Sequence, residues 1–191
     1  CLAAGVAPVA VIGDLDSLSD TARARFSDRL FPVEEQETTD FDKALRQIAA
    51  PLVVAIGFSG GRFDHELAVL NTLLRHPGRP CLILGRESLT FLCPSCLDLR
   101  LAPGTPVSLF PMGPAPVRSS GLVWPTDGLD FRPDGRIGTS NAMGPEGDAR
   151  LSADRPRMLV ILPRAALVPA AAAVRAAPRW RDAARQSVRG K

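Results

Sequence analysis

Short apolar runs separated by amphipathic segments fill the first half of the chain. These runs have the length of buried strands and lie at residues 8–12, 31–33, 52–56 and 81–84. Gly13 ends the first of them and Gly57 ends the third. The run at residues 89–92 follows closely enough to be an antiparallel neighbour of the run at residues 81–84.

Three helical patterns lie between these runs. The first begins at Ser19, and the second is capped by Thr39 or Asp40 and continues to about residue 50. The third opens at Asp64 or just before it, and its apolar face is formed by leucines: Leu67, Leu70, Leu73 and Leu74. Strands that alternate with helices at this spacing predict a right-handed parallel α/β layer. Such layers bind ligands at the carboxyl ends of their strands, where Gly13-Asp14 and residues 57–60 fall.

The pattern changes after about Ser95, where proline and glycine become frequent. Short apolar runs at residues 107–110, 121–124 and 157–162 alternate with turn signals, and Asp134-Gly135 is a hairpin signal. We therefore predict an α/β domain over residues 1–95, followed over residues 96–191 by a small antiparallel β-sandwich domain. From residue 164 onward, an alanine-rich segment interrupted by prolines predicts a short helix or a loose tail.

Composition and charge favour a small-molecule enzyme. The 191 residues are 46% hydrophobic and 23% charged, which is an ordinary balance for a globular protein. Part of the net charge of +3 comes from the basic segment 175–191, which we expect to be a solvated surface and not a nucleic-acid site. No apolar run approaches the ~20 residues that span a bilayer, and no signal peptide is visible. A soluble, cytoplasmic protein without a membrane or nucleic-acid partner is expected.

The beginning of the chain and its cysteines each allow an inference. Residues 1–6 are typical of the end of a helix with a stop at Gly5, so we expect the chain to be N-terminally incomplete. Cys81 lies in an apolar run and is expected in the core. Cys93 and Cys96 have CxxC spacing without a second pair or a nearby histidine. This is a weak zinc signal, and the alternative is two small residues near a domain joint in a reducing cytosol.

Acidic residues gather in the first third of the chain. Asp14 and Asp16 follow a strand and point the same way in an extended chain, so they can share a cation. The alternative is an Asp-rich turn in which Ser17 or Ser19 caps a helix. Converging carboxylates repel one another unless a cation lies between them, and Mg²⁺ with phosphate oxygens is the usual solution. The cluster therefore favours phosphate chemistry, whereas Asp42 is expected to be an ordinary residue of a first helical turn.

Two further segments carry groups suited to phosphate. Lys43 lies one turn inside the helix that Thr39 and Asp40 open, where it meets a phosphate or pairs with that side of the helix. The loop from Gly57 to Arg62 offers backbone N–H groups and a guanidinium for phosphate, or is a plain flexible loop. Its spacing is neither that of a Walker A loop nor that of a dinucleotide fingerprint.

Other chemistry has less support. Neither His65 nor His76 has a recognisable serine or cysteine partner, which disfavours a hydrolase triad. Trp124 precedes a proline in a β context, and it is either a core residue or a flat surface for stacking on a cationic aromatic ring.

Five segments, in order over roughly residues 1–165, resemble motifs of the thiamine pyrophosphokinase family. They are Gly13-Asp14-Leu15-Asp16-Ser17, residues 36–45, residues 60–73, Gly121-Leu122-Val123-Trp124-Pro125 and Gly138-Thr139-Ser140-Asn141. The resemblance implies an N-terminal α/β domain that holds ATP and Mg²⁺, and a C-terminal β-sandwich that contributes to the thiamine site. It also implies a homodimer with sites formed between subunits. The reaction implied is transfer of pyrophosphate from ATP to the thiamine hydroxyl, which gives thiamine diphosphate and AMP.

The resemblance also implies roles for individual residues. The Mg²⁺ carboxylates would be Asp14, Asp16 and Asp40, and Asp64 would lie near the reacting centre. The groups that position ATP phosphates would be Gln36, Thr39, Lys43, Gly60, Gly61 and Arg62. Trp124 would stack on the thiamine pyrimidine, with Ser140 and Asn141 near the substrate pocket.

Two departures from the family pattern leave alternatives open. The sequence lacks the family's upstream segment with an Asp-Gly-Gly-Ala type of turn, and Glu35 and Glu37 stand where the family more often has aspartate. The alternatives are a relative that binds thiamine or nucleotide without catalysis, and a Mg²⁺-dependent phosphohydrolase.

Overall fold

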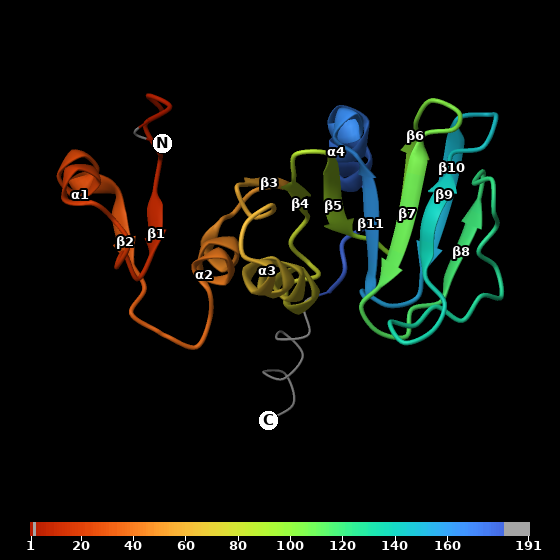
Figure 1. Ribbon diagram of the computed structural model, residues 1–191, viewed down its shortest axis with the longest axis horizontal. Helices are drawn as coiled ribbons and strands as arrows, with labels where there is room; N and C mark the ends of the chain where they lie inside the picture. Colours follow the sequence, from red (N-terminus) through yellow and green to blue (C-terminus); the bar gives the residue numbers. More distant parts are fainter. Residues whose placement is uncertain (2, 182–191) are drawn as a thin grey trace. The chain divides into compact units, whose positions relative to one another are not determined.

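The computed structural model describes residue 1 and residues 3–181, which form two compact units, Cys1–Ala49 and Ala50–Lys191 (Figure 1). The predicted boundary at residues 95–96 falls inside the second unit, and its assignment as a domain boundary stays a prediction. The predicted basic segment continues beyond residue 181, and that part lies outside the described residues. Among the described residues, no helix combines the length and apolar character needed to cross a bilayer.

The first unit is a short parallel strand pair with two helices. Strand β1 (Val11–Gly13) pairs with β2 (Leu30–Pro32), helix α1 spans Asp20–Arg25, and α2 spans Asp40–Gln47. The predicted caps are confirmed, because the Ser19 hydroxyl accepts a hydrogen bond from the Ala22 amide and the Thr39 hydroxyl accepts one from the Asp42 amide. The buried apolar side chains of the unit are Leu15, Ala22, Phe26, Phe41 and Leu45.

The second unit contains a six-stranded sheet in the order β3-β4-β5-β11-β7-β9 and a three-stranded sheet in the order β6-β10-β8. Their strands are β3 (Val53–Ile56), β4 (Cys81–Leu84), β5 (Ser88–Leu92), β6 (Cys96–Arg100), β7 (Pro106–Pro111), β8 (Val117–Ser120), β9 (Gly138–Ala142), β10 (Asp148–Ala153) and β11 (Met158–Pro163). Helices α3 (Phe63–Arg75) and α4 (Leu167–Ala176) also belong to this unit.

The predicted fold class is confirmed, because parallel pairing in the N-terminal half gives way to antiparallel pairing. Strand β3 is parallel to β4, and every later pairing between named strands is antiparallel. The change occurs within a single sheet at β4–β5, as expected for the run at residues 89–92.

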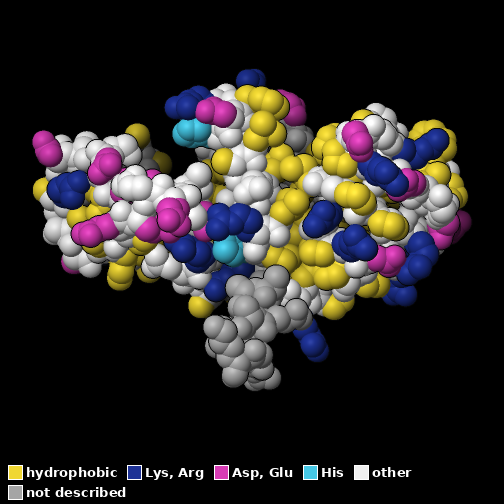
Figure 2. Space-filling view, turned by 90° about the horizontal axis from the view of Figure 1, so that it is seen from below, with side chains coloured by type: hydrophobic (Ala, Val, Ile, Leu, Met, Phe, Trp, Pro, Cys, Tyr) yellow, Lys and Arg dark blue, Asp and Glu magenta, His cyan; other side chains and the backbone are white. Residues whose placement is uncertain are grey.

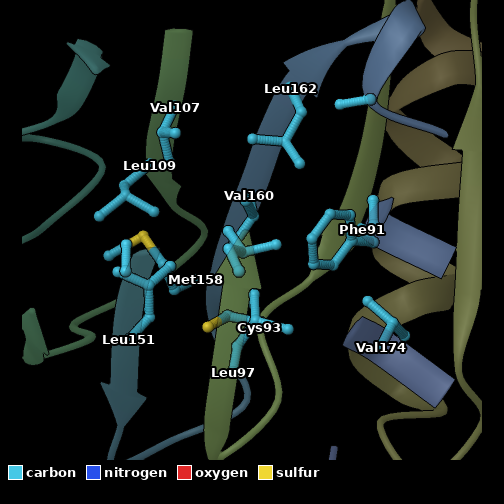
Figure 3. Close-up of a cluster of buried hydrophobic side chains, with 14 of the residues drawn as sticks. Phe91, Cys93, Leu97, Val107, Leu109, Leu151, Met158, Val160, Leu162 and Val174 are labelled. Atoms are coloured by element: carbon cyan, nitrogen blue, oxygen red, sulfur yellow. The ribbon is translucent and has the colours of Figure 1, made fainter. Parts of the chain in front are cut away.

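The main core lies between the two sheets and under α4. Side chains from β6 and β10 face those from β7 and β11 in Figure 3, with Phe91 and Val174 closing one end. Phe91 is fully buried, so truncating it to alanine would cost about 3–5 kcal/mol of stability. Cys81 is buried as predicted, and Cys93 lies in the core beside Leu97.

Two predicted features differ in detail. The segment at residues 121–124 is not a strand: Leu122 forms an isolated bridge with Met143. Gly121 has a φ of 79°, and a Cβ there would lie 1.9 Å from the Asp148 carbonyl oxygen, so a close approach to β10 replaces extended pairing. In α3 the buried positions are Val69, Thr72 and Leu73, while Leu67 is exposed. Thr72 tolerates burial because its hydroxyl donates to the Ala68 carbonyl at 3.0 Å.

Candidate functional site

Asp14, Asp40 and Lys43 form a compact charged cluster in the first unit. The Lys43 ammonium lies 3.4 Å from Asp14 Oδ2 and 3.3 Å from Asp40 Oδ1, and its side chain is 1% exposed. The Asp14 amide also donates to Asp40 Oδ1 at 3.3 Å. The end of β1 and the first turn of α2 thus bring together two carboxylates that are 26 residues apart in the chain.

Gly13 allows this approach. A Cβ at this position would lie 2.7 Å from Asp40 Oδ1, and the backbone has a φ of 153°. The next turn is also constrained, because Leu15 has a φ of 64° and is buried. The Arg23 guanidinium donates to the Leu15 carbonyl at 3.0 Å, which fixes the turn to α1. The position of Asp14 beside Asp40 therefore depends on the positive φ values of its two neighbours, Gly13 and Leu15.

The cluster shifts the protonation equilibria of two of its members. The amide of Asp16, which donates to Asp14 Oδ1, and the nearby Lys43 ammonium lower the pKa of Asp14. Burial alone would lower the pKa of Lys43, but the hydrogen bonds and charges of Asp40 and Asp14 outweigh it and raise that pKa. The Asp14 carboxylate and the Lys43 ammonium are thus both charged near neutral pH.

The third carboxylate expected to bind Mg²⁺ is that of Asp16. It is exposed, and no group of three or more His, Cys, Asp or Glu side chains arranged to hold a metal ion occurs among residue 1 and residues 3–181. Asp14 and Asp40 alone still suit Mg²⁺, which usually takes one or two carboxylates and completes its shell with water and phosphate oxygens. The assignment of all three carboxylates to Mg²⁺ stays a prediction.

Lys43 and Thr39 have structural tasks beside their predicted phosphate roles. The Lys43 ammonium binds the carboxylate pair, and the Thr39 hydroxyl accepts the Asp42 amide hydrogen bond at 3.3 Å. Gln36 is exposed in the loop before α2. Its predicted contact with phosphate remains untested.

A network around Arg46 was missed by the sequence analysis. Its guanidinium lies 3.3 Å from Asp42 Oδ1 and 3.3 Å from Glu35 Oε2, and Asp42 is 1% exposed. The Thr38 hydroxyl, its amide and Arg46 lower the pKa of Glu35. The i,i+4 spacing of Asp42 and Arg46 was the available signal. The network fastens the acidic loop at residues 35–38 to α2, and Asp42 is a buried anchor, not an ordinary first-turn residue.

The loop at residues 57–62 belongs to the second unit. It follows β3, and Gly57 and Gly60 adopt positive φ values of 88° and 84°. The Gly60 amide donates to Glu66 Oε1 at 2.9 Å, so a side chain from the first turn of α3 already holds one of the backbone donors expected to bind phosphate. Gly61 is exposed, and a methyl group on its Cα would meet no atom within 4 Å, so its surroundings are open.

Arg62 and Asp64 form an exposed two-bond ion pair at the start of α3. Arg62 Nε lies 3.2 Å from Asp64 Oδ1, and Arg62 Nη2 lies 2.6 Å from Asp64 Oδ2. The hydrogen bonds to Arg62 lower the pKa of Asp64, and the same bonds raise that of Arg62. The structure thus brings together Arg62, the predicted phosphate ligand, and Asp64, the carboxylate predicted near the reacting centre. Each compensates the charge of the other.

Trp124, Ser140 and Asn141 line one pocket of about 300 Å³ in the β region, as the sequence analysis expected of a shared substrate site. Trp124 is 59% exposed, which contradicts a core position and agrees with a stacking surface. Phe131 and Leu129 contribute apolar wall, and the exposed Arg136 contributes a cation. Walls that combine aromatic and apolar side chains with several polar groups suit a small heteroaromatic ligand.

A β-bulge in β9 shapes this pocket. Val107 pairs with Asn141 and Leu109 pairs with Gly138, so Ser108 alone faces Thr139 and Ser140. Ser140 has a φ of 65°, and its amide donates to the Ser108 hydroxyl at 3.0 Å. Because of the extra residue, Thr139 and Ser140 are both exposed while Asn141 is buried.

Charge is distributed unequally between the units. Residues 1–49 contain nine acidic and five basic residues, so the first unit is acidic although the whole chain has a net charge of +3. In Figure 2 acidic side chains gather on the first unit, and basic side chains are spread over the second. An acidic unit that carries the Asp14–Asp40 pair suits a divalent cation.

Family models match both halves of the chain. Residues 2–83 match the model described as "Thiamin pyrophosphokinase, catalytic domain", and residues 96–158 match "Thiamin pyrophosphokinase, vitamin B1 binding domain". Thiamine pyrophosphokinase 3 of Oryza sativa subsp. japonica is 30% identical over 159 residues, covering 73% of this chain and 60% of the rice protein. Thiamine pyrophosphokinase 2 of Arabidopsis thaliana is 34% identical over 128 residues, covering 59% and 48%. The chain thus spans about half to three fifths of the length of these relatives.

Solved structures share the fold at lower identity. The thiamine pyrophosphokinase of Bacillus subtilis superposes with a TM-score of 0.68 at 20% identity, covering 85% of this chain and 81% of that one. The enzyme of Candida albicans gives a TM-score of 0.68 at 15% identity, covering 83% and 74%. With the two family models matching successive parts of the sequence, the chain belongs to the thiamin pyrophosphokinase family.

Proposed function

We propose that this protein transfers pyrophosphate from ATP to the hydroxyl group of thiamine, giving thiamine diphosphate and AMP. The observation that carries the proposal is the Asp14–Asp40 pair held around a buried cation, in a chain that also has an aromatic pocket. The thiamine oxygen forms a bond to the β-phosphorus of ATP, and the bond from that phosphorus to the AMP oxygen breaks. Such a reaction depends on charge compensation and positioning more than on a protein nucleophile.

Asp14 and Asp40 are the residues that would hold Mg²⁺, with Asp16 nearby on the same turn. When bound, the ion would compensate the negative charge of the ATP phosphates. The chain's own part is to keep the two carboxylates adjacent and Asp14 ionised. Lys43, the amide of Asp16 and the close approach at Gly13 accomplish this.

Arg62 and the loop before it are proposed to bind ATP phosphates. Two hydrogen bonds to Asp64 already orient the Arg62 guanidinium. Planar guanidinium groups bind phosphate through paired hydrogen bonds. Gly61 leaves its backbone open to a phosphate, whereas the Gly60 amide would have to exchange Glu66 for the phosphate. Gln36 and Thr39 are also proposed to bind ATP phosphates. Asp64 then lies beside the phosphate that reacts.

Thiamine is proposed to lie in the pocket beside Trp124. The exposed indole offers a flat face to the pyrimidine ring, and the cationic character of thiamine strengthens stacking on an aromatic face. Ser140 contributes its hydroxyl at the pocket wall.

We further propose that the protein acts as a homodimer, because two parts of the second unit lie far apart. The loop with Arg62 follows β3, at one edge of the six-stranded sheet, whereas Asn141 lies in β9 at the other edge (Figure 1). Five steps between neighbouring strands correspond to roughly 24 Å, since strands are spaced about 4.8 Å apart. Thiamine, with two small rings, is too short to bridge this distance, so the pocket of one copy is proposed to serve the phosphate loop of another. A cytoplasmic location remains an expectation.

The test is release of AMP from ATP, measured with and without thiamine in the presence of Mg²⁺. We expect AMP and thiamine diphosphate in equal amounts, and no comparable release without thiamine. Formation of ADP with a phosphorylated product would contradict the proposal. ATP loss that is independent of thiamine would favour a phosphohydrolase, and calorimetric binding of thiamine without AMP would favour a non-catalytic relative.

A further inference from the structure

The backbone of Trp124 is fixed by a buried amide side chain. The Trp124 amide donates to Asn141 Oδ1 at 3.1 Å, and Asn141 Nδ2 donates to the Trp124 carbonyl at 2.7 Å. The Ala142 amide also donates to Asn141 Oδ1, at 2.8 Å. Asn141 is 7% exposed, so its oxygen and at least one of its amide hydrogens are engaged with the chain itself and not with the pocket.

A second buried group fixes the same loop two residues later. The Thr126 hydroxyl donates to the Val117 carbonyl at 2.7 Å, and the Thr126 amide donates to the Ser119 hydroxyl at 3.0 Å. Thr126 is buried, and both partners belong to β8. The exposed indole of Trp124 is therefore carried by a segment that is tied to β9 on one side and to β8 on the other.

We infer that Asn141 and Thr126 are positioning residues for Trp124, and that Asn141 acts on thiamine through Trp124 and not by direct contact. The inference rests on the proposed function and changes the role first expected for Asn141. Buried polar groups that satisfy one another hold a segment in a single conformation, because each broken bond would leave an unpaired donor or acceptor. An exposed aromatic on such a segment loses little freedom when a ring stacks on it, which favours binding.

The bulge in β9 explains why Asn141 can take this role. Ser140 occupies the extra position with its amide bonded to Ser108, so the Asn141 side chain is buried at a point where regular alternation would expose it after Thr139 and Ser140. The pocket thus separates two tasks: Ser140 lies at the wall, and Asn141 supports Trp124.

The first experiment measures the mobility of Trp124 without any ligand. Trp124 and Trp180 are the two tryptophans of the sequence, so Trp180→Phe leaves Trp124 as the single emitter. In that background, Asn141→Ala and Thr126→Val should each increase the amplitude of sub-nanosecond depolarisation in time-resolved fluorescence anisotropy. Asn71→Asp, at an exposed position of α3, is the control that should leave it unchanged. Unchanged depolarisation in both test variants would overturn the inference.

The second experiment is a double-mutant cycle on the full chain. Asn141→Ala alone should raise the KM for thiamine about tenfold, as expected when a stacking contact is weakened. In a Trp124→Ala background the same change should have no further effect, because the group it positions is gone. Additive effects would show that Asn141 contacts thiamine itself and would overturn the inference. Thr126→Val provides the same comparison if Asn141→Ala does not fold.

The two experiments separate failure of this inference from failure of the proposed function. If the unaltered protein does not bind thiamine, the proposed function is wrong, and the anisotropy measurement still decides whether Asn141 and Thr126 hold Trp124. If thiamine binds and the effects of Asn141→Ala and Trp124→Ala on the KM add, the proposed function is retained and the positioning role of Asn141 is wrong.

Discussion

Arg62 and Asp64 bind each other through two parallel hydrogen bonds of 3.2 and 2.6 Å at the first turn of α3. The pair is exposed, so solvent screens it and its contribution to stability is small. Its importance is geometric, because a phosphate that approaches Arg62 must share the guanidinium with Asp64 or displace it.

Asp64→Asn should separate the two expected roles. Loss of the carboxylate frees Arg62, so the KM for ATP should stay the same or fall. The kcat should fall by about 100-fold if Asp64 acts on the reacting groups. Arg62→Lys keeps the positive charge but loses the paired N–H donors of the guanidinium. It should raise the KM for ATP about tenfold. Steady-state kinetics with varied ATP will measure both, and an unchanged kcat in Asp64→Asn would remove Asp64 from the reacting centre.

Lys43→Met should destabilise the first unit. It leaves the Asp14 and Asp40 carboxylates adjacent without the buried ammonium between them, so they repel each other. We expect a Tm several degrees lower than that of the unaltered protein, and a Tm that rises more steeply with Mg²⁺ concentration. Differential scanning calorimetry at several Mg²⁺ concentrations measures both. Arg86→Met, which removes the cation of an exposed pair with Glu87, is the matched control and should leave Tm nearly unchanged. A Tm equal to that of the unaltered protein would contradict the role of Lys43.

The same cluster predicts how stability depends on pH. The pKa of Asp14 is lowered by folding, so its contribution is present above the ordinary carboxyl range and is lost as pH falls through the lowered value. The pKa of Lys43 is raised, so its contribution is present below the ordinary lysine range and is lost as pH rises through the raised value. The free energy of unfolding should therefore decline below about pH 4 and above about pH 10. Urea titrations across this range should show that Lys43→Met lacks the alkaline decline contributed by Lys43.

Gly13→Ala should disrupt the carboxylate pair without changing any charge. The added methyl carbon would lie 2.7 Å from Asp40 Oδ1, which forces the carboxylate or the turn to move. We expect a loss of kcat of at least about tenfold, measured as AMP release, and that factor corresponds to about 1.4 kcal/mol of lost transition-state stabilisation. In Gly135→Ala the nearest atom would be Arg132 Cβ at 3.5 Å, an ordinary contact, so this control should retain activity. Equal activity in both variants would show that Asp40 needs no fixed position.

The cysteines should differ in reactivity. Burial raises the pKa of both Cys81 and Cys93 to about 12, so these thiols stay protonated and inaccessible at mildly alkaline pH. Cys1 is exposed. Alkylation of the folded protein with iodoacetamide, followed by mass spectrometry, should modify Cys1 and should spare Cys81 and Cys93 until denaturant is added. Modification of Cys93 at the rate of Cys1 would contradict its place in the core.

Local chemistry made part of this structure predictable. The caps at Ser19 and Thr39 and the strand at residues 81–84 follow from neighbouring residues alone, and the structure confirms them. The meeting of Asp14 with Asp40 agrees with their expected positions at a strand end and a helix start. The burial of Lys43 was not predictable, since it depends on packing of the whole unit.

The features that the sequence did not predict depend on contacts between separate segments of the chain. The apolar run at residues 121–124 has the pattern of a strand, but the contact of Gly121 with the Asp148 carbonyl excludes extended pairing there. Likewise, the spacing of Asp42 and Arg46 indicates their i,i+4 pair, but the same guanidinium also binds Glu35, which lies in the loop before α2. Neither the contact with the Asp148 carbonyl nor the contact with Glu35 is identifiable from the local pattern.

The extra residue in β9 makes the pocket more sensitive to chain length than to side-chain identity. Substitutions at Thr139 keep the count of residues between Gly138 and Asn141, and the pairing with β7 survives. Deletion of one residue would restore a regular ladder in which Asn141 stays opposite Val107 and keeps its face, but only one residue would remain between Gly138 and Asn141. The pocket wall would then lose one of its two adjacent exposed side chains, Thr139 or Ser140. Engineered changes of specificity in this protein should therefore replace residues around the bulge and leave its length untouched.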